Sequence, residues 1–228
     1  MKFKLLITIL LTANFCFSQS LPEEKNSRHR DMKFFAILGG GASFRTAKSQ
    51  DGISGEEKAY LKELKSGRNF DLSIYYQKSE VGGFGLKYNL YQSKADGESV
   101  ANGKFGDDIK ISFIGATAFI SENTSARVGE AFLELGLGYI EYKNSSYVFN
   151  DQRMSFKGGN LGLATSLAYH FRINKHILIG PQFAFVGGIL KKIKITYPDN
   201  TSETVTLDDD ALESLYRIDL NVSAKIRF

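Results

Sequence analysis

The final segment of the chain, residues 216–228, alternates strictly between apolar and polar side chains. Every even-numbered residue is apolar, from Tyr216 to Phe228, and every odd-numbered residue is polar, from Arg217 to Arg227. A period of two is that of a β-strand, whose successive side chains point to opposite faces. The segment therefore predicts a strand with one apolar face and one charged face.

Seven further stretches show the same signal. Residues 33–44 alternate less clearly because Gly39, Gly40 and Gly41 blur the face, and the others are residues 70–77, 84–90, 109–113, 133–139, 161–172 and 177–185. Together with the final segment they predict eight strands of about 10 residues, the length at which a tilted strand crosses a bilayer. Strands of a soluble sandwich average only about 5–6 residues. No segment after residue 18 has the ~18 apolar residues of a transmembrane helix.

The connections between these stretches alternate in length. The long ones are residues 46–68, 93–108, 143–159 and 191–214, and the short ones are residues 79–82, 121–126 and 174–175. This alternation is typical of a barrel with long outer loops and tight periplasmic turns. An open sheet edge in lipid would leave backbone groups unpaired, so the sheet should close. We expect an all-β, up-and-down, eight-stranded antiparallel transmembrane β-barrel, with ten strands as the alternative if residues 191–214 joined the wall.

Residues 1–18 have the features of a secretory signal peptide. Lys2 and Lys4 precede a short apolar stretch, and Cys16 to Ser18 fit a cleavage site before Gln19. A lipoprotein cut at Cys16 is the alternative, but Phe15 is bulky for that site. We expect a signal peptide (1–18), a flexible periplasmic tail (19–31) and the barrel (32–228), with both termini in the periplasm.

Cleavage also limits the chemistry. It removes the only cysteine and, with it, disulfides and thiolate chemistry. The net charge falls from +4 to +2, because two of the 29 basic residues are lost against 25 acidic ones. That balance is too mild for nucleic-acid binding. The apolar strand faces predict membrane lipid as a partner.

The polar face of the strands predicts what fills the lumen. An eight-stranded barrel is just wide enough for side chains to fill it. The predicted charge network consists of Asp71, Lys87, Lys110, Glu134, Arg172, Arg217, Asp219, Lys225 and Arg227. We interpret it as an ionic plug, with Asp71, Lys110, Arg217 and Asp219 meeting in the outer half. A narrow gated ion path is the alternative.

The sequence does not predict an enzyme, a cofactor or a metal site. Of three histidines, His29 lies in the tail, and His170 and His176 flank the tight turn near Asn174, where polar residues are expected. An all-carboxylate site at Asp208, Asp209, Asp210 and Glu213 remains an alternative, although the spacing fits no EF-hand. Gly39 to Gly41 lack the lysine of a phosphate loop and are typical of close strand packing.

The long loops carry some predicted structure of their own. Residues 55–65 place Tyr60, Leu61 and Leu64 at helical spacing, which predicts a short amphipathic helix that caps the lumen. Residues 147–149 and 193–197 are β-like, and a Pro198-Asp199-Asn200 turn follows the second. Hairpins above the membrane would present strand edges to a partner.

The terminal alternation resembles the sorting signal that the barrel-folding machinery reads, with Phe228 preceded by Leu220, Val222, Ala224 and Ile226. Over residues 32–228 the chain resembles the small eight-stranded bacterial outer-membrane barrel superfamily. Strands such as residues 135–139, Leu-Gly-Leu-Gly-Tyr, resemble the PorT-type branch, which implies an association with type IX secretion. The resemblance implies a structural or interaction role in the outer membrane. A small pore and a lipid-acting outer-membrane enzyme are the alternatives.

Overall fold

The structure is a computed structural model that describes residues 33–46, 55–99, 103–124, 129–148, 152–208 and 212–228. Every described residue belongs to one compact unit, Met32–Phe228. The predicted signal peptide (1–18) and tail (19–31) lie outside the described residues, as do Asp209 and Asp210.

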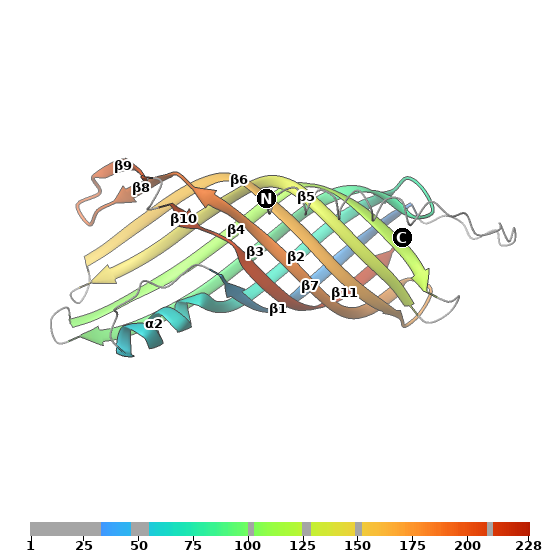
Figure 1. Ribbon diagram of the computed structural model, residues 1–228, viewed down its shortest axis with the longest axis horizontal. Helices are drawn as coiled ribbons and strands as arrows, with labels where there is room; N and C mark the ends of the chain where they lie inside the picture. Colours follow the sequence, from blue (N-terminus) through green and yellow to red (C-terminus); the bar gives the residue numbers. More distant parts are fainter. Residues whose placement is uncertain (1–32, 47–54, 100–102, 125–128, 149–151, 209–211) are drawn as a thin grey trace, which may run out of the picture. The chain divides into compact units, whose positions relative to one another are not determined.

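Eight strands form a closed antiparallel ring in the order β1, β2, β3, β4, β5, β6, β7, β11 (Figure 1). Pairing of β11 with β1 and of β6 with β7 closes it. The elements are β1 (Phe34–Arg45), α2 (Gly55–Lys65), β2 (Ser66–Gln77), β3 (Gly82–Ser99), β4 (Gly103–Thr124), β5 (Gly129–Val148), β6 (Gln152–Arg172), β7 (Ile177–Leu190), β8 (Lys192–Thr196), β9 (Ser202–Thr206), β10 (Glu213–Ser214) and β11 (Arg217–Arg227).

The eight-stranded barrel predicted from the sequence is confirmed, and the ten-stranded alternative is wrong. The β8–β9 hairpin does not separate β6 from β7, because it pairs with β6 only at residues 155–157. The predicted helix at residues 55–65 is α2. No helix among the described residues is long and apolar enough to cross a membrane.

The barrel has two different ends. At the turn end, tight turns are closed by bonds such as Ile173 N–H to Ile177 O at 3.0 Å, and Phe228 N–H donates to Phe34 O over 3.1 Å. At the loop end lie α2 and the β8–β9 hairpin (Figure 1). Two predicted long loops, residues 93–108 and 143–159, are mostly strand, since β3 to β6 continue through them in register.

An apolar belt surrounds the barrel on its outer face. Its side chains are large and exposed, up to 69 % for Leu161, an arrangement that a water-soluble surface would not favour. In lipid the same residues are well solvated. We define the apolar belt by Phe70, Ile74, Phe84, Leu86, Ile114, Ile120, Leu133, Leu135, Leu137, Tyr139, Leu161, Leu163, Leu167, Phe171, Phe183, Leu220 and Val222.

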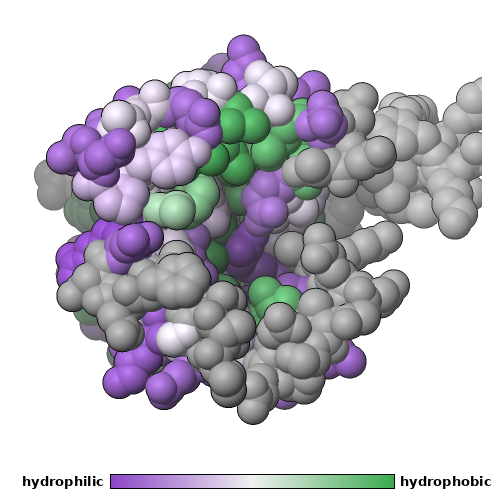
Figure 2. Space-filling view, turned by 90° about the vertical axis from the view of Figure 1, so that its left-hand side faces the viewer, coloured by the Kyte–Doolittle hydropathy of each residue, from purple (hydrophilic) through white to green (hydrophobic). Residues whose placement is uncertain are grey.

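Toward the loop end the polarity of the wall is reversed. Ile111 and Phe113 of β4 are fully buried inside the barrel, whereas Lys110 is exposed outside, so the predicted place of Lys110 in the lumen is wrong. β4 has 22 residues, about twice the number that crosses a bilayer. Toward the loop end the wall therefore has apolar residues inside and polar residues outside, the arrangement expected of a wall surrounded by water. Figure 2 shows this end with hydrophilic residues along much of the coloured rim and with hydrophobic and hydrophilic residues side by side toward the centre.

Candidate functional site

A network of buried charges crosses the middle of the lumen between β2, β3 and β5. Lys87 Nζ lies 2.7 Å from Asp71 Oδ2 and 3.3 Å from Glu134 Oε2, and all three side chains are at most 1 % exposed. Glu134 Oε2 also accepts hydrogen bonds from the Tyr75 hydroxyl at 2.7 Å and the Ser166 hydroxyl at 2.8 Å. Neutral donors thus help one lysine to balance two carboxylates.

Asn89 joins this network to a second ion pair on β11. Its Nδ2 donates to Asp71 Oδ2 over 3.0 Å and to Asp219 Oδ2 over 3.1 Å. Arg217 Nε lies 3.6 Å from Asp219 Oδ1, and Arg217 Nη2 donates to Asn89 Oδ1. The Ser43 hydroxyl of β1 also donates to Asp219. Together with the first group, these polar side chains link six strands, β1, β2, β3, β5, β6 and β11, across the lumen.

A third cluster of charges lies at the turn end. Lys225 Nζ is 2.5 Å from Glu130 Oε1, and Arg227 Nη2 donates to Glu130 Oε2. Lys225 Nζ also lies 3.8 Å from the centroid of the Phe35 ring, a cation–π contact. Glu130 carries the countercharge for both cations, so the cluster is charged but almost completely enclosed.

Buried apolar side chains lie in the lumen on both sides of the central network. The turn-end group is Phe35, Ile37, Tyr75, Phe119, Phe132 and Ala168. The loop-end group is Leu64, Tyr91, Ala95, Ile109, Ile111, Phe113, Ile140, Tyr142, Ala164, Val186, Leu190 and Leu215.

Helix α2 contributes to the loop-end closure. Leu64 is part of the apolar group there, and its carbonyl accepts bonds from the Tyr91 and Ser93 hydroxyls, both at 2.9 Å. One turn earlier, the Tyr60 hydroxyl donates to Asp107 of β4. Burial and this carboxylate raise the pKa of Tyr60 well above its ordinary value.

The structure places most of the predicted network together. Within the lumen or at its turn end lie Asp71, Lys87, Glu134, Arg217, Asp219, Lys225 and Arg227. Asp71, Arg217 and Asp219 meet through Asn89, but Lys110 does not join them. Its Nζ lies 4.0 Å from Asp108 Oδ2 on the outer surface.

Arg172 is also misplaced in the predicted network. It has the alternation of the lumen-facing residues of β6, but it lies at the last position of the strand and is exposed. Its Nη2 donates to Asn123 Oδ1 over 3.4 Å. Alternation gives the face of a strand but does not show where the closed lumen ends.

Sequence reasoning missed Glu130 and misplaced His170. Glu130 falls four residues before Glu134 on the same face of β5, a spacing that could have revealed it. His170 was interpreted as a turn residue. It is instead fully buried in the lumen, where its Nε2 lies 2.9 Å from Ser223 Oγ.

The residues of the predicted sorting signal lie on the outer face of β11. Leu220, Val222 and Phe228 are exposed by 51, 67 and 61 %, and Ala224 and Ile226 are half-buried. Apolar residues there contact lipid in the folded barrel, and their role in assembly remains a prediction.

The histidines and acidic residues are the described groups that could take part in catalysis or hold a metal ion. The described residues contain no group of three or more His, Cys, Asp or Glu placed to hold a metal ion. His170 and Ser223 are at most 1 % exposed, so a substrate could not reach them. His176 is at the turn end, where its Nδ1 lies 3.2 Å from the Arg227 carbonyl oxygen.

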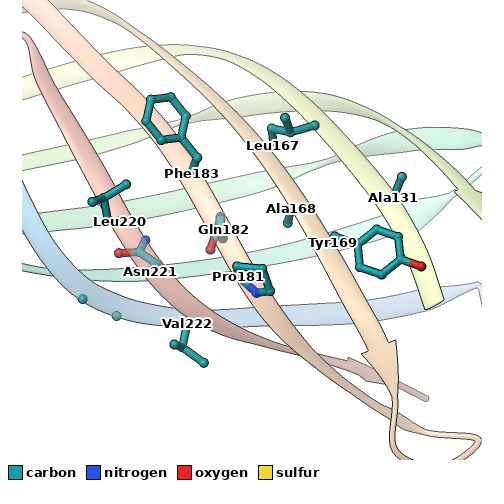
Figure 3. Close-up of a pocket in the computed structure, with 12 residues that line it drawn as sticks. Ala131, Leu167, Ala168, Tyr169, Pro181, Gln182, Phe183, Leu220, Asn221 and Val222 are labelled. Carbon is teal, nitrogen blue, oxygen red and sulfur yellow. The ribbon is translucent and has the colours of Figure 1, made fainter. Parts of the chain in front are cut away.

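A pocket of about 610 Å³ lies in the barrel wall where β6, β7, β11 and β1 adjoin (Figure 3). Pro181 provides no N–H for the β6 ladder, in which pairing stops at Ala168 and resumes at Phe171. Gly41 allows close contact of β1 and β11, because a Cβ there would lie 1.9 Å from Leu220 O. The lining is mainly apolar, with Gln182 and Asn221 as its amides.

A closed barrel with an apolar belt outside and paired charges inside is the architecture of a membrane-spanning β-barrel. The protein is therefore a transmembrane β-barrel of the outer-membrane type. No family model matches the chain, and no curated protein matches it.

Solved structures with a similar fold do exist. A major outer membrane protein from Thermus thermophilus is 9 % identical, with a TM-score of 0.54, and the match covers 86 % of this chain and 98 % of the other. OprG from Pseudomonas aeruginosa is 16 % identical, with a TM-score of 0.49, and 86 and 97 % are covered. Ail of Yersinia pestis is 17 % identical, with a TM-score of 0.44, and 86 and 99 % are covered. At these identities the likeness extends to the fold alone.

Proposed function

We propose that the protein is an integral protein of the bacterial outer membrane whose lumen is plugged and which acts through its loop end. The observation that carries the plug is the closure of the lumen by two apolar groups with a buried ionic network between them. Arg217, Lys87 and Asp71 are each at most 1 % exposed. A path for hydrated ions would require these contacts to separate.

The orientation follows from the two ends of the barrel. Tight turns are typical of the periplasmic end of such barrels, and long loops of the outside. We therefore place both chain termini in the periplasm, and α2 and the β8–β9 hairpin on the cell surface. This places a polar-walled rim, rather than a channel mouth, in contact with the surroundings.

Conductance across a planar bilayer tests the plug. We expect no steady single-channel steps from the folded protein at neutral pH, while an open barrel in the same bilayer conducts. Persistent steps would favour a small pore, the second candidate.

One observation supports the small pore: both side-chain polar atoms of Asn221 are buried without a hydrogen-bond partner in the described part of the chain. Water in a narrow path would satisfy them.

The proposed role is structural or interactive rather than enzymatic. The partners would be outer-membrane lipid, the barrel-assembly machinery and an envelope protein, and the glycine- and tyrosine-rich strands support a PorT-like link to secretion. Mild crosslinking of whole cells followed by purification tests that link. We expect secretion components to be recovered, and recovery of none would contradict it.

A further inference from the structure

Four lysines occupy neighbouring positions on successive strands near the loop end. The strand registers place Lys110 of β4 opposite Lys143 of β5, Lys143 opposite Lys157 of β6, and Lys157 opposite Lys194 of β8. We call these four residues the lysine row. They lie along one line of cross-strand pairs on β4, β5, β6 and β8, and Figure 1 labels these strands.

All four lysines point to the outside of the barrel. Each is exposed, whereas the residues beside them, Ile111 and Tyr142, are buried inside. Phe156 and Ile193, on the strands of Lys157 and Lys194, pack against the loop-end core. The row is therefore one continuous feature of the outer surface.

The row has an excess of positive charge. Directly opposed like charges destabilise a sheet unless an anion lies between them. Lys110 and Lys143 have acidic neighbours, Asp108 at 4.0 Å and Glu141 at 2.7 Å, but both pairs are exposed and so contribute little. Within the described part of the chain, Lys157 and Lys194 form no ion pair.

On the other side of Lys110, the line of cross-strand pairs continues through β3 to a further cation on β2. Lys110 is opposite Gln92 of β3, and Gln92 is opposite Arg68 of β2. Arg68 is exposed and lies two residues from Phe70, which belongs to the apolar belt. The line thus extends from the edge of the belt across six strands of the sheet, and five of its six residues are cationic.

The position of the row relative to the belt identifies what surrounds it. The outermost belt residues on β4, β5 and β6 are Ile114, Tyr139 and Leu161, each four residues from the lysine on its strand. At about 3.3 Å per residue and a tilt of ~40°, this is ~10 Å along the membrane normal. Lysine side chains can also bend back toward the boundary. Because the strands are tilted, a line of cross-strand pairs is inclined to the membrane plane, and neighbouring lysines differ in height by ~3 Å. The row therefore begins near the level of the lipid headgroups at Lys110 and rises from there toward Lys194.

We propose that the lysine row binds the phosphate groups of an anionic, polyphosphorylated lipid in the outer leaflet. Acyl chains on the apolar belt would place the headgroup beside the lysines. Lysine binds phosphate well as a point charge, and four lysines about 4.8 Å apart can hold more than one phosphate. The inference rests on the proposed orientation, with the loop end outside.

Lipid retention measured by native mass spectrometry tests the proposal. The folded full chain is released from micelles containing a chelator and a bisphosphorylated glucosamine-disaccharide lipid. Parallel samples contain the same lipid without phosphates, or the soluble polyphosphate inositol hexakisphosphate. We expect retention of the phosphorylated lipid alone. Equal retention of the dephosphorylated lipid, or equally tight binding of the soluble anion, would overturn a lipid-specific site.

Two matched triple variants separate the row from general charge. Lys143→Gln, Lys157→Gln and Lys194→Gln together should lower retention at least about tenfold. Lys33→Gln, Lys78→Gln and Lys175→Gln remove the same charge at the turn end, where all three lysines are exposed, and should change it less than about twofold. Equal effects of the two variants would overturn the proposal.

Labelling of Lys194→Cys in whole cells with a membrane-impermeant maleimide tests the orientation separately. Labelling together with unchanged retention in the row variant would overturn the lysine row and leave the proposed orientation intact. Absence of labelling, with labelling restored after the envelope is opened, would overturn both.

Discussion

Lys87 is the residue on which the central lumen network depends, because it is the cation shared by Asp71 and Glu134. Lys87→Ala would leave two carboxylates buried without it, and we expect a loss of about 3–5 kcal/mol in the free energy of unfolding. Lys110→Ala makes the same change on the next strand at an exposed position and should stay within about 0.5 kcal/mol. Urea titration of the barrel refolded in phosphocholine vesicles measures both. Similar small losses would show that the lumen is hydrated rather than plugged.

The sequence indicates which residues face the lumen but not how they pair. A charged residue such as Asp71 or Asp219 in a lipid-crossing strand has to face inward, and alternation was enough to place it there. Asn89 carries no charge and gave no sign that it links the two ion pairs, because that depends on which strands face each other across the barrel. Such pairing is set by the closed ring and cannot be read along one strand.

At the scale of single elements, the docking of α2 should depend on pH. Because the pKa of Tyr60 is raised when the helix is docked, docking is strongest while the undocked tyrosine is still protonated. It should weaken as the pH rises above the ordinary tyrosine pKa of about 10. The mobility of a spin label at Lys62→Cys reports docking. Tyr60→Phe should remove this pH dependence, and an unchanged dependence in that variant would contradict the assignment.

The reversal of polarity along β4 predicts where the membrane ends. Ala118 is exposed well inside the apolar belt, and Ser112 lies on the same face nearer the loop end. Ala118→Arg should cost about 2–4 kcal/mol of unfolding free energy in vesicles, and Ser112→Arg about 0–1 kcal/mol. Urea titration compares the two variants. Equal costs would show that lipid covers both positions.

The same strand explains why the sequence predicted the belt correctly but not the outer wall. Ile109, Ile111 and Phe113 alternate with polar residues, as belt residues do, so they were predicted to face lipid. The sequence shows the same period of two in both cases. In lipid the apolar face points outward, and where the wall is surrounded by water it points into the barrel. Only the position of the segment along the barrel distinguishes these cases, and it follows from the strand register.

At the scale of the whole molecule, one continuous sheet is built for two surroundings, lipid around the belt and water toward the loop end. Around the belt the barrel is apolar outside and charged inside, and toward the loop end it is polar outside and apolar inside. The charged residues of the lumen lie between two groups of buried apolar side chains. Long strands that continue past the belt therefore build a rigid surface platform without a separate domain.

The ring should not need the β8–β9 hairpin in order to fold. Leu207 N–H already donates to Lys191 O over 2.9 Å, so a Gly-Ser-Gly linker can replace residues 192–206. Closure depends on β6 and β7, which pair across residues 162–172 and 178–188. We expect the deleted chain to keep the heat-modifiable gel mobility and the β-type circular dichroism of a folded barrel. The same linker in place of residues 180–188 should abolish both, because it removes wall strand β7. If the hairpin deletion abolished them too, β8 and β9 would be part of the closed wall, and the eight-stranded ring would be insufficient for folding.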